Sequence, residues 1–198
     1  MPDQSSEQLL EMSLQELWEL FPIVLQSHNP QYKEWYAAER QSILKTVGMN
    51  NVARINHIGS TAVEGLLAKP TIDILLEIVK ACNTAQLSEN LLQEGWLLMS
   101  ENSDPLSLVF NKGYTLHGFA EKVFHLHVRH LGDWDELYFR DYLIAHPDVA
   151  MVYGDLKRNL LEEFEHNRDG YTKAKSEFIL KHTGTARQEF SERYLIIK

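Results

Sequence analysis

The residues best suited to carry chemistry in this chain lie close together, between Asn56 and Glu77. Gly59 and Ser60 form a Gly-Ser turn after a short strand-like segment, and Thr61 adds a second hydroxyl. Backbone N–H groups and hydroxyls at such a turn can hold a phosphate group. Asp73 follows in the middle of an apolar run, where a carboxylate is costly to bury unless it is paired or bound to a cation. This order predicts a phosphate site opposite an acidic strand, as in proteins that handle nucleotides.

The Gly-Ser turn does not match two well-known motifs. Between Gly59 and Gly65 lie five residues rather than the four of a P-loop, and Leu66 stands where a P-loop has its lysine. No G-x-S-x-G pattern surrounds Ser60, which argues against a serine hydrolase. A turn without any function remains the alternative interpretation.

Asp73 is the candidate catalytic carboxylate and metal ligand. Glu77 projects from the same strand face, but four residues correspond to about 13 Å along a strand, too far for both to bind one ion directly. We therefore expect Glu77 at the wet end of the strand. Asp73 remains the better candidate because its neighbours Ile72 and Ile74 are apolar.

Two histidines are candidate partners of Asp73. His125 and His127 flank Leu126, so both imidazoles project from one face of a predicted strand. Such a pair can reach one metal ion or contact one phosphate, so Asp73, His125 and His127 form the predicted metal set. The expected cofactor is Mg²⁺ or another divalent metal. The alternative is that both histidines lie on a solvated strand face.

Basic side chains complete the predicted site. Lys69 follows the Gly-Ser turn closely, and Arg140 and Lys157 lie in the helical C-terminal part of the chain. Most lysines and arginines on helices face solvent. A fold that brings Lys69, Arg140 and Lys157 to one cleft would make them phosphate ligands.

Hydrophobic periodicity predicts the elements that position these groups. We expect strands at 52–58, 71–79, 96–100, 106–112 and 124–130 and helices at 32–47, 83–93, 133–145, from there to about 166, and at 172–181. Gly48 is expected to end the first long helix, 168–170 to form a turn, and Gly184 to interrupt the last helical region. The result is an α/β (α+β) fold, a small mixed sheet with helices before and after it in sequence.

Length and composition bound the fold and the function classes. A chain of 198 residues with 44% hydrophobic content forms one main domain. We expect a helical N-terminal extension at 1–28, the main domain at 29–182 and a C-terminal segment at 183–198. A net charge of −9 argues against an extended nucleic-acid surface but leaves room for a local basic pocket.

The N-terminus is acidic and polar, and no apolar run approaches the ~20 residues that cross a bilayer. A cytoplasmic protein without a membrane partner is therefore expected. The single cysteine, Cys82, excludes an internal disulfide and a cysteine-based zinc cluster.

The chain resembles the GrpB (UPF0157) family. The resemblance covers roughly 29–180, in the family's order. The matching stretches are His57–Val63 with Gly65–Ile74, Tyr32–Tyr36 with Glu39, Phe124–Val128, Phe139–Leu143 with His146-Pro147, Tyr153, Leu156-Lys157 and Tyr171–Ser176.

This resemblance implies a nucleotidyltransferase-like fold. In that superfamily a Gly-Ser turn holds a triphosphate, and an Asp-x-Asp pair with a third carboxylate holds two magnesium ions. Gly59-Ser60 and Asp73 match the turn and the first carboxylate, but Leu75 stands at the second position and histidines stand where the third is expected. One acidic ligand does not hold two hard cations in the usual way, which puts nucleotidyl transfer in doubt.

Three hypotheses follow. The first is a transferase that carries out metal-assisted phosphoryl or nucleotidyl transfer on a small molecule. The second is a binding module that keeps a pocket for a nucleotide or small phosphorylated molecule without the chemistry. The third is an interaction protein, a homo-oligomer that associates through Trp18 and Phe21 of the N-terminal helix.

Overall fold

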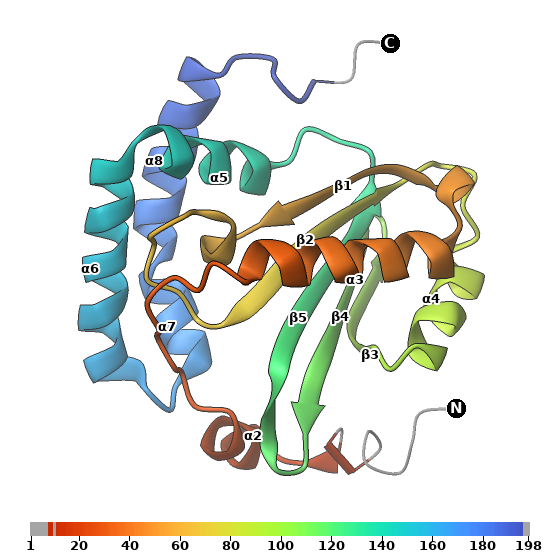
Figure 1. Cartoon of the computed structure of the whole chain (residues 1–198), viewed down its shortest axis with the longest axis horizontal. Coiled ribbons are helices and arrows are strands. Elements are labelled where there is room, and N and C mark those ends of the chain that lie inside the picture. The colour runs from red at the N-terminus through yellow and green to blue at the C-terminus, as the bar shows by residue number, and fades with distance from the viewer. Residues whose placement is uncertain (1–7, 10, 196–198) are drawn as a thin grey trace.

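A five-stranded mixed sheet forms the centre of the molecule, and its strands follow the order β1-β2-β5-β4-β3 (Figure 1). The computed structural model describes residues 8, 9 and 11–195. The strands are β1 (Val52–Ile58), β2 (Thr71–Ile78), β3 (Leu97–Ser103), β4 (Leu106–Thr115) and β5 (Gly118–His130). The neighbours β2 and β5 are parallel, whereas the other pairs are antiparallel. The predicted α/β (α+β) class is confirmed.

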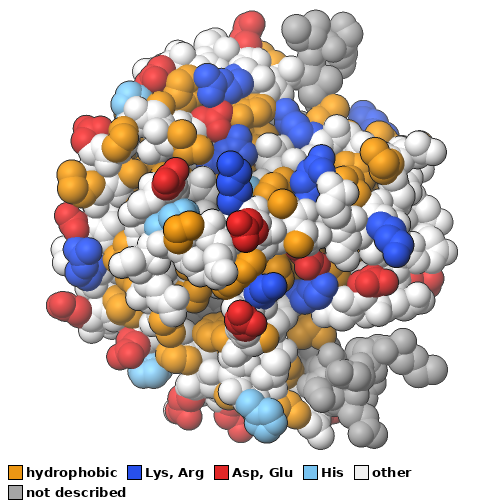
Figure 2. All heavy atoms as spheres, in the orientation of Figure 1, with side chains coloured by type: hydrophobic (Ala, Val, Ile, Leu, Met, Phe, Trp, Pro, Cys, Tyr) orange, Lys and Arg blue, Asp and Glu red, His pale blue; other side chains and the backbone are white. Residues whose placement is uncertain are grey.

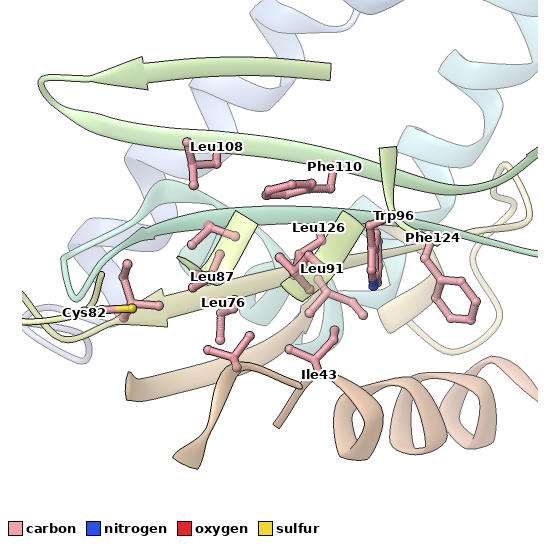
Figure 3. Packing of buried hydrophobic residues seen from close by; sticks show 14 of the residues in the cluster. Ile43, Leu76, Cys82, Leu87, Leu91, Trp96, Leu108, Phe110, Phe124 and Leu126 are labelled. Carbon is pink, nitrogen blue, oxygen red and sulfur yellow. The ribbon is translucent and has the colours of Figure 1, made fainter. Parts of the chain in front are cut away.

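One face of the sheet carries the main hydrophobic core, under α3 (Tyr32–Val47) and α4 (Thr84–Gln93) (Figure 3). Strand β2 alternates as the sequence predicts, and its four isoleucine and leucine side chains at even positions are fully buried in this cluster. Gly48 ends α3 with φ of +83°, as expected. Cys82 also lies in this core as a free thiol (Figure 3).

The C-terminal helices gather at one side of the sheet, away from α4 (Figure 1). They are α5 (Asp135–Ala145), α6 (Pro147–Phe164), α7 (Arg168–Ala174) and α8 (Ser176–Glu189). On the second sheet face, Leu75 is fully buried against Ile58 and Leu137, which joins β2 to α5. The cleft described below lies between this sheet face and these helices.

The C-terminal helices differ from the sequence prediction in two places. The expected turn at 168–170 is wrong, because Asn167 caps α7 by accepting a hydrogen bond from the Gly170 backbone N–H at 2.9 Å. The expected break at Gly184 is also wrong, since α8 continues through it. An exposed glycine inside a helix costs only about 1 kcal/mol relative to alanine, which neighbouring contacts can offset. The expected domain boundary at residue 182 falls inside this helix.

The segment before α3 packs along the sheet and the C-terminal helices. Helix α2 (Leu14–Leu20) begins with a capping box formed by Ser13 and Glu16. Beyond it, Gln26 pairs with Ala68 through two backbone hydrogen bonds of 2.8 and 3.0 Å. This pairing fixes the loop that follows the Gly-Ser turn.

The surface facing the viewer shows acidic and basic side chains interspersed over the elements (Figure 2). None of the described helices combines the length and apolar character that a bilayer crossing requires.

Candidate functional site

The Gly-Ser turn lies directly over Asp73. Strand β1 ends at Ile58, and Gly59 adopts φ of +71° before the short 3₁₀ turn Ser60–Ala62. A Cβ atom added to Gly59 would overlap Oδ2 of Asp73. Only glycine fits this position, because both the backbone conformation and the close approach exclude a side chain.

Thr61 ties the turn to the sheet. Its Oγ1 donates a hydrogen bond to the Thr71 carbonyl oxygen at 2.9 Å and lies 3.0 Å from Nε2 of His57. Burial lowers the pKa of His57 to about 4, so the ring is neutral, and it stacks on Tyr36. Because the Thr61 hydroxyl donates its proton to the Thr71 carbonyl oxygen, it accepts from His57, whose Nε2–H is the donor. Thr61 lines the cleft, but its hydroxyl proton is engaged within the fold.

Asp73 belongs to a hydrogen-bonded chain of three side chains. The parallel register of β2 and β5 sets Asp73 opposite His125. Nδ1 of His125 lies 3.1 Å from Oδ1 of Asp73, and Nε2 of His125 lies 2.8 Å from the hydroxyl of Tyr114. Burial alone would raise the pKa of Asp73, but the His125 hydrogen bond and nearby positive charge outweigh it and lower that pKa. Asp73 is therefore a carboxylate at neutral pH.

His127 occupies the next outward position on β5, opposite Leu75. Burial lowers the pKa of His127, which keeps its imidazole neutral above that pKa. The structure thus confirms that His125 and His127 share the face of the sheet that carries Asp73.

Lys157 reaches the turn from helix α6. Its side chain is 2% exposed, and its Nζ donates to Oγ of Ser60 at 3.0 Å and to the Leu67 carbonyl oxygen. The ammonium also lies 4.7 Å from the centroid of the Tyr153 ring. Burial, and secondarily the charge of Lys175, lower the pKa of Lys157 to about 7. A buried amine attached to the Gly-Ser turn is the most unusual group in the cleft.

Two further lysines border the same cavity. Nζ of Lys175 lies 4.2 Å and Nζ of Lys69 lies 5.5 Å from the ring centroid of Tyr171. Tyr171 is fully buried and its hydroxyl has no hydrogen-bond partner among the described residues. The cavity has a volume of about 280 Å³, and we call it the basic compartment. Its lining consists of Gly59, Ser60, Thr61, Lys69, Thr71, Asp73, His125, His127, Tyr153, Lys157, Tyr171, Thr172 and Lys175.

Two acidic or basic residues lie elsewhere than expected. Arg140 is not among the lining residues, because it donates to the His57 carbonyl oxygen, to Asp141 and to the hydroxyl of Tyr194. It therefore joins β1 to the C-terminal part of the chain.

The expectation that Glu77 lies at a wet strand end is wrong. Glu77 is fully buried and forms a two-point ion pair with Arg54, at 2.5 and 2.7 Å. Strand β2 runs between β1 and β5, and the β1 register sets Arg54 opposite Glu77. A buried carboxylate at this position needs that cation.

The predicted metal set does not fit the observed geometry. Both ring nitrogens of His125 face side-chain oxygens, those of Asp73 and Tyr114. Leu75, at the place of the superfamily's second carboxylate, is fully buried in an apolar cluster. Within residues 8, 9 and 11–195, no three His, Cys, Asp or Glu side chains form a group able to hold a metal ion. The residues present therefore do not form the two-magnesium site of the superfamily.

Most of the chain matches one known protein family. The model of the GrpB protein family matches residues 22–185, which is most of the chain. This chain belongs to the GrpB family. It is 35% identical over 159 residues to a UPF0157 protein of Pseudomonas aeruginosa, covering 80% of this chain but 65% of that protein. It is 34% identical over 161 residues to the glutamate-rich protein GrpB of Alkalihalophilus pseudofirmus, covering 79% and 91% of the two chains.

Solved structures support the same family and its fold. The crystal structure of GrpB from Enterococcus faecalis matches with a TM-score of 0.75 and 26% identity, covering 85% of this chain and all of that one. The Cid1 poly(U) polymerase with Mg and 3'-dATP bound matches with a TM-score of 0.51 and 11% identity, over 81% of this chain and 51% of the polymerase. At that identity the likeness shows the fold alone, which is nucleotidyltransferase-like.

The GrpB cleft contains groups that the sequence alone did not single out. Tyr153 on α6, Tyr171 on α7 and Lys175 between α7 and α8 line the basic compartment, and all three are far from the turn in sequence. The one available signal was their place in the family-like stretches near Lys157 and 171–176.

Proposed function

We propose that this GrpB protein binds a small phosphorylated molecule of the nucleotide class in the basic compartment. The observation that carries the proposal is Lys157, a buried amine held at the Gly-Ser turn by two neutral oxygens. Among the described residues, no ion pair within 4.0 Å includes Lys157. An anion entering the compartment would supply the missing counter-charge.

The charges of the lining residues favour an anion. The lining includes the three lysines Lys69, Lys157 and Lys175 but a single carboxylate, Asp73. In the metal-bound sites of the superfamily, cations neutralise the phosphate charge. Here the lysines are the groups able to do so, since ammonium groups act as point charges for phosphate oxygens.

The turn supplies the neutral part of the anion site. Ser60 accepts the hydrogen bond of Lys157, so its own hydroxyl proton remains able to donate to a phosphate oxygen. The unpartnered Tyr171 hydroxyl offers a further donor after a small rearrangement. Asp73 lies beside this site, and its carboxylate repels an anion that comes too close. This repulsion limits how far the phosphate group enters the basic compartment.

A second candidate function is phosphoryl or nucleotidyl transfer. The hydrogen bonds that link Tyr114, His125 and Asp73 favour this function, because they orient the Asp73 carboxylate to accept a proton from a ligand hydroxyl. This interpretation gives Asp73 the role of general base and needs a phosphorylated ligand in the same compartment.

A calorimetric titration with ADP, in EDTA and then with added MgCl₂, tests the proposal. We expect ADP to bind in EDTA and the affinity to change by less than about threefold with Mg²⁺, because lysines carry the charge. Lys157→Met should weaken binding by about tenfold or more, as expected for a lost charge-assisted contact. Arg158→Met is the matched control, since Arg158 is exposed and pairs with Asp155.

The variant Asp73→Asn separates the two charge arrangements. If lysines alone neutralise the phosphate charge, removing the negative charge of Asp73 should strengthen ADP binding in EDTA. Binding that appears only with Mg²⁺ and disappears in Asp73→Asn would overturn the proposal in favour of a metal site. No binding in either buffer would reject a phosphate site altogether.

A further inference from the structure

A second cavity of about 760 Å³ adjoins the basic compartment, and we call it the second compartment. Helices α5 and α8 form its outer walls, with Trp134 and Phe139 on one side and Ile179, Thr183 and Arg187 on the other. The two cavities share six lining residues, which are Gly59, Ser60, Asp73, His127, Tyr153 and Thr172. They are therefore two parts of one cleft, joined beside Asp73.

The charges of the second compartment are arranged differently from those of the basic compartment. Its two arginines are already paired, Arg129 with Glu136 at 2.8 Å, and Arg187 with Asp133 and Asp135 at 2.6 and 2.5 Å. With Asp73 added, carboxylates outnumber arginines in the lining. A second anionic group is disfavoured here, whereas a neutral or amine-bearing group is not.

Thr183, whose buried hydroxyl has no hydrogen-bond partner among the described residues, also lines this compartment. Thr183 on α8 is 5% exposed, and its Oγ1 makes no hydrogen bond among the described residues. Thr185, two residues on, bonds its Oγ1 to the Lys181 carbonyl oxygen at 3.3 Å in the usual helical manner. Leaving the Thr183 hydroxyl unpaired costs stability, and a ligand group that bonds to it would remove that cost.

We propose that the second compartment receives the organic body of the ligand, an uncharged or amine-bearing group rich in hydrogen-bonding hydroxyl or amino groups. Thr183 is its hydrogen-bonding partner, and the carboxylates of the compartment exclude bodies that carry a second anion. This inference rests on the proposed function, because the phosphate of the same ligand lies in the basic compartment. The cleft thereby selects ligands by the charge of the part that is not phosphate.

Three sugar phosphates with the same phosphate group test this selection by calorimetry. Glucosamine 6-phosphate carries an amine, glucose 6-phosphate is neutral apart from its phosphate, and 6-phosphogluconate carries a carboxylate. We expect glucosamine 6-phosphate and glucose 6-phosphate to bind more tightly than inorganic phosphate. We expect 6-phosphogluconate to bind about tenfold more weakly than glucosamine 6-phosphate, since one misplaced charge near a carboxylate is worth at least 1.4 kcal/mol.

Thr183→Val identifies the hydroxyl as the contact. It should weaken glucose 6-phosphate binding by about fivefold, the equivalent of one neutral hydrogen bond, and leave inorganic phosphate binding unchanged. The free protein should melt at the same or a higher temperature, because the removed hydroxyl has no hydrogen-bond partner among the described residues. The control Thr185→Val should leave both affinities unchanged.

The two proposals fail in different ways. If inorganic phosphate binds in a Lys157-dependent manner but the three sugar phosphates bind equally well, the second compartment is not a subsite and the inference is wrong. An unchanged glucose 6-phosphate affinity in Thr183→Val would show that the Thr183 hydroxyl does not contact the ligand. If inorganic phosphate, the three sugar phosphates and ADP all fail to bind, the proposed function itself is rejected.

Discussion

At the scale of single residues, Lys157 is the group whose chemistry departs most from the ordinary. Its amine is buried, and burial lowers its pKa to about 7. The lysine is therefore charged in mildly acidic solution and largely neutral in mildly alkaline solution. Anion binding at the basic compartment should follow this change.

We predict that sulfate binding weakens as the pH rises from 6 to 8.5. Sulfate keeps its charge over this range, so the loss reports on the protein. A single lysine with a pKa near 7 that must be protonated for binding reduces the affinity by about tenfold or more over this interval. Sulfate titrations at several pH values measure this, and the same series with Lys157→Met should be flat. A flat profile in the unmodified protein would contradict the role of Lys157.

The same residue makes a prediction about stability. The pKa of Lys157 is lower in the folded than in the unfolded chain, where it is about 10.4. Between these two values the unfolded chain binds more protons, so stability rises with pH there, and below pH 7 the cost of a buried charge is fully present. Lys157→Met should therefore raise the free energy of unfolding by about 1 to 2 kcal/mol at pH 6 and by less at pH 9. Denaturant unfolding at both pH values measures the difference, and a larger gain at pH 9 would contradict it.

At the scale of elements, the turn between β1 and β2 positions the site. Gly59 combines a positive φ with a backbone that lies against Asp73. Gly65, a few residues on, has nearly the same φ of +77° but nothing within 4 Å of an added Cβ. A side chain at either glycine would strain the backbone, but only at Gly59 would its Cβ also overlap Asp73.

We predict that Gly59→Ala lowers the free energy of unfolding by about 3 kcal/mol or more and weakens anion binding, because Asp73 must move. Gly65→Ala should cost only about 1 kcal/mol and leave anion binding unchanged, since only the backbone conformation is strained. Thermal or denaturant unfolding and a sulfate titration of both variants provide the measurement. Equal losses in the two variants would show that the close approach to Asp73 has no energetic consequence.

At the scale of the whole molecule, the segment after α2 connects the N-terminal part to the site. Phe21 is 6% exposed, and its ring centroid lies 4.8 Å from that of Tyr114 and 5.1 Å from that of Phe119. Tyr114 in turn contacts His125. Phe21 therefore acts within this chain, whereas the hypothesis of self-association had assigned it to a second copy.

We predict that Phe21→Ala lowers the free energy of unfolding by about 3 kcal/mol, as for other buried aromatic residues. Leu14→Ala, at a side chain that is 64% exposed, should change it by less than about 0.5 kcal/mol. Denaturant unfolding of both variants measures the difference. An unchanged stability in Phe21→Ala, together with a smaller particle size in light scattering, would favour the self-association hypothesis instead.

The local features of this GrpB protein follow from short stretches of its amino-acid sequence. The period of two along β2 indicated which side chains face the core and which face the cleft, because neighbouring residues of a strand point to opposite sides. The glycine at the turn, the capping box of α2 and the two outward histidines of β5 are also short-range patterns. Each depends on residues a few positions apart, so each could be predicted.

Which charged groups meet depends on the three-dimensional fold. Lys157 and Ser60 are 97 positions apart in the chain, and no local pattern connects them. The same holds for Arg54 and Glu77, which form a buried ion pair although Glu77 was expected to face water. It also holds for Arg140, which bonds to the His57 carbonyl oxygen and does not line the cleft. The partner of a charged side chain depends on sheet order and helix packing, and these arise from long-range contacts that the charged residues themselves do not specify.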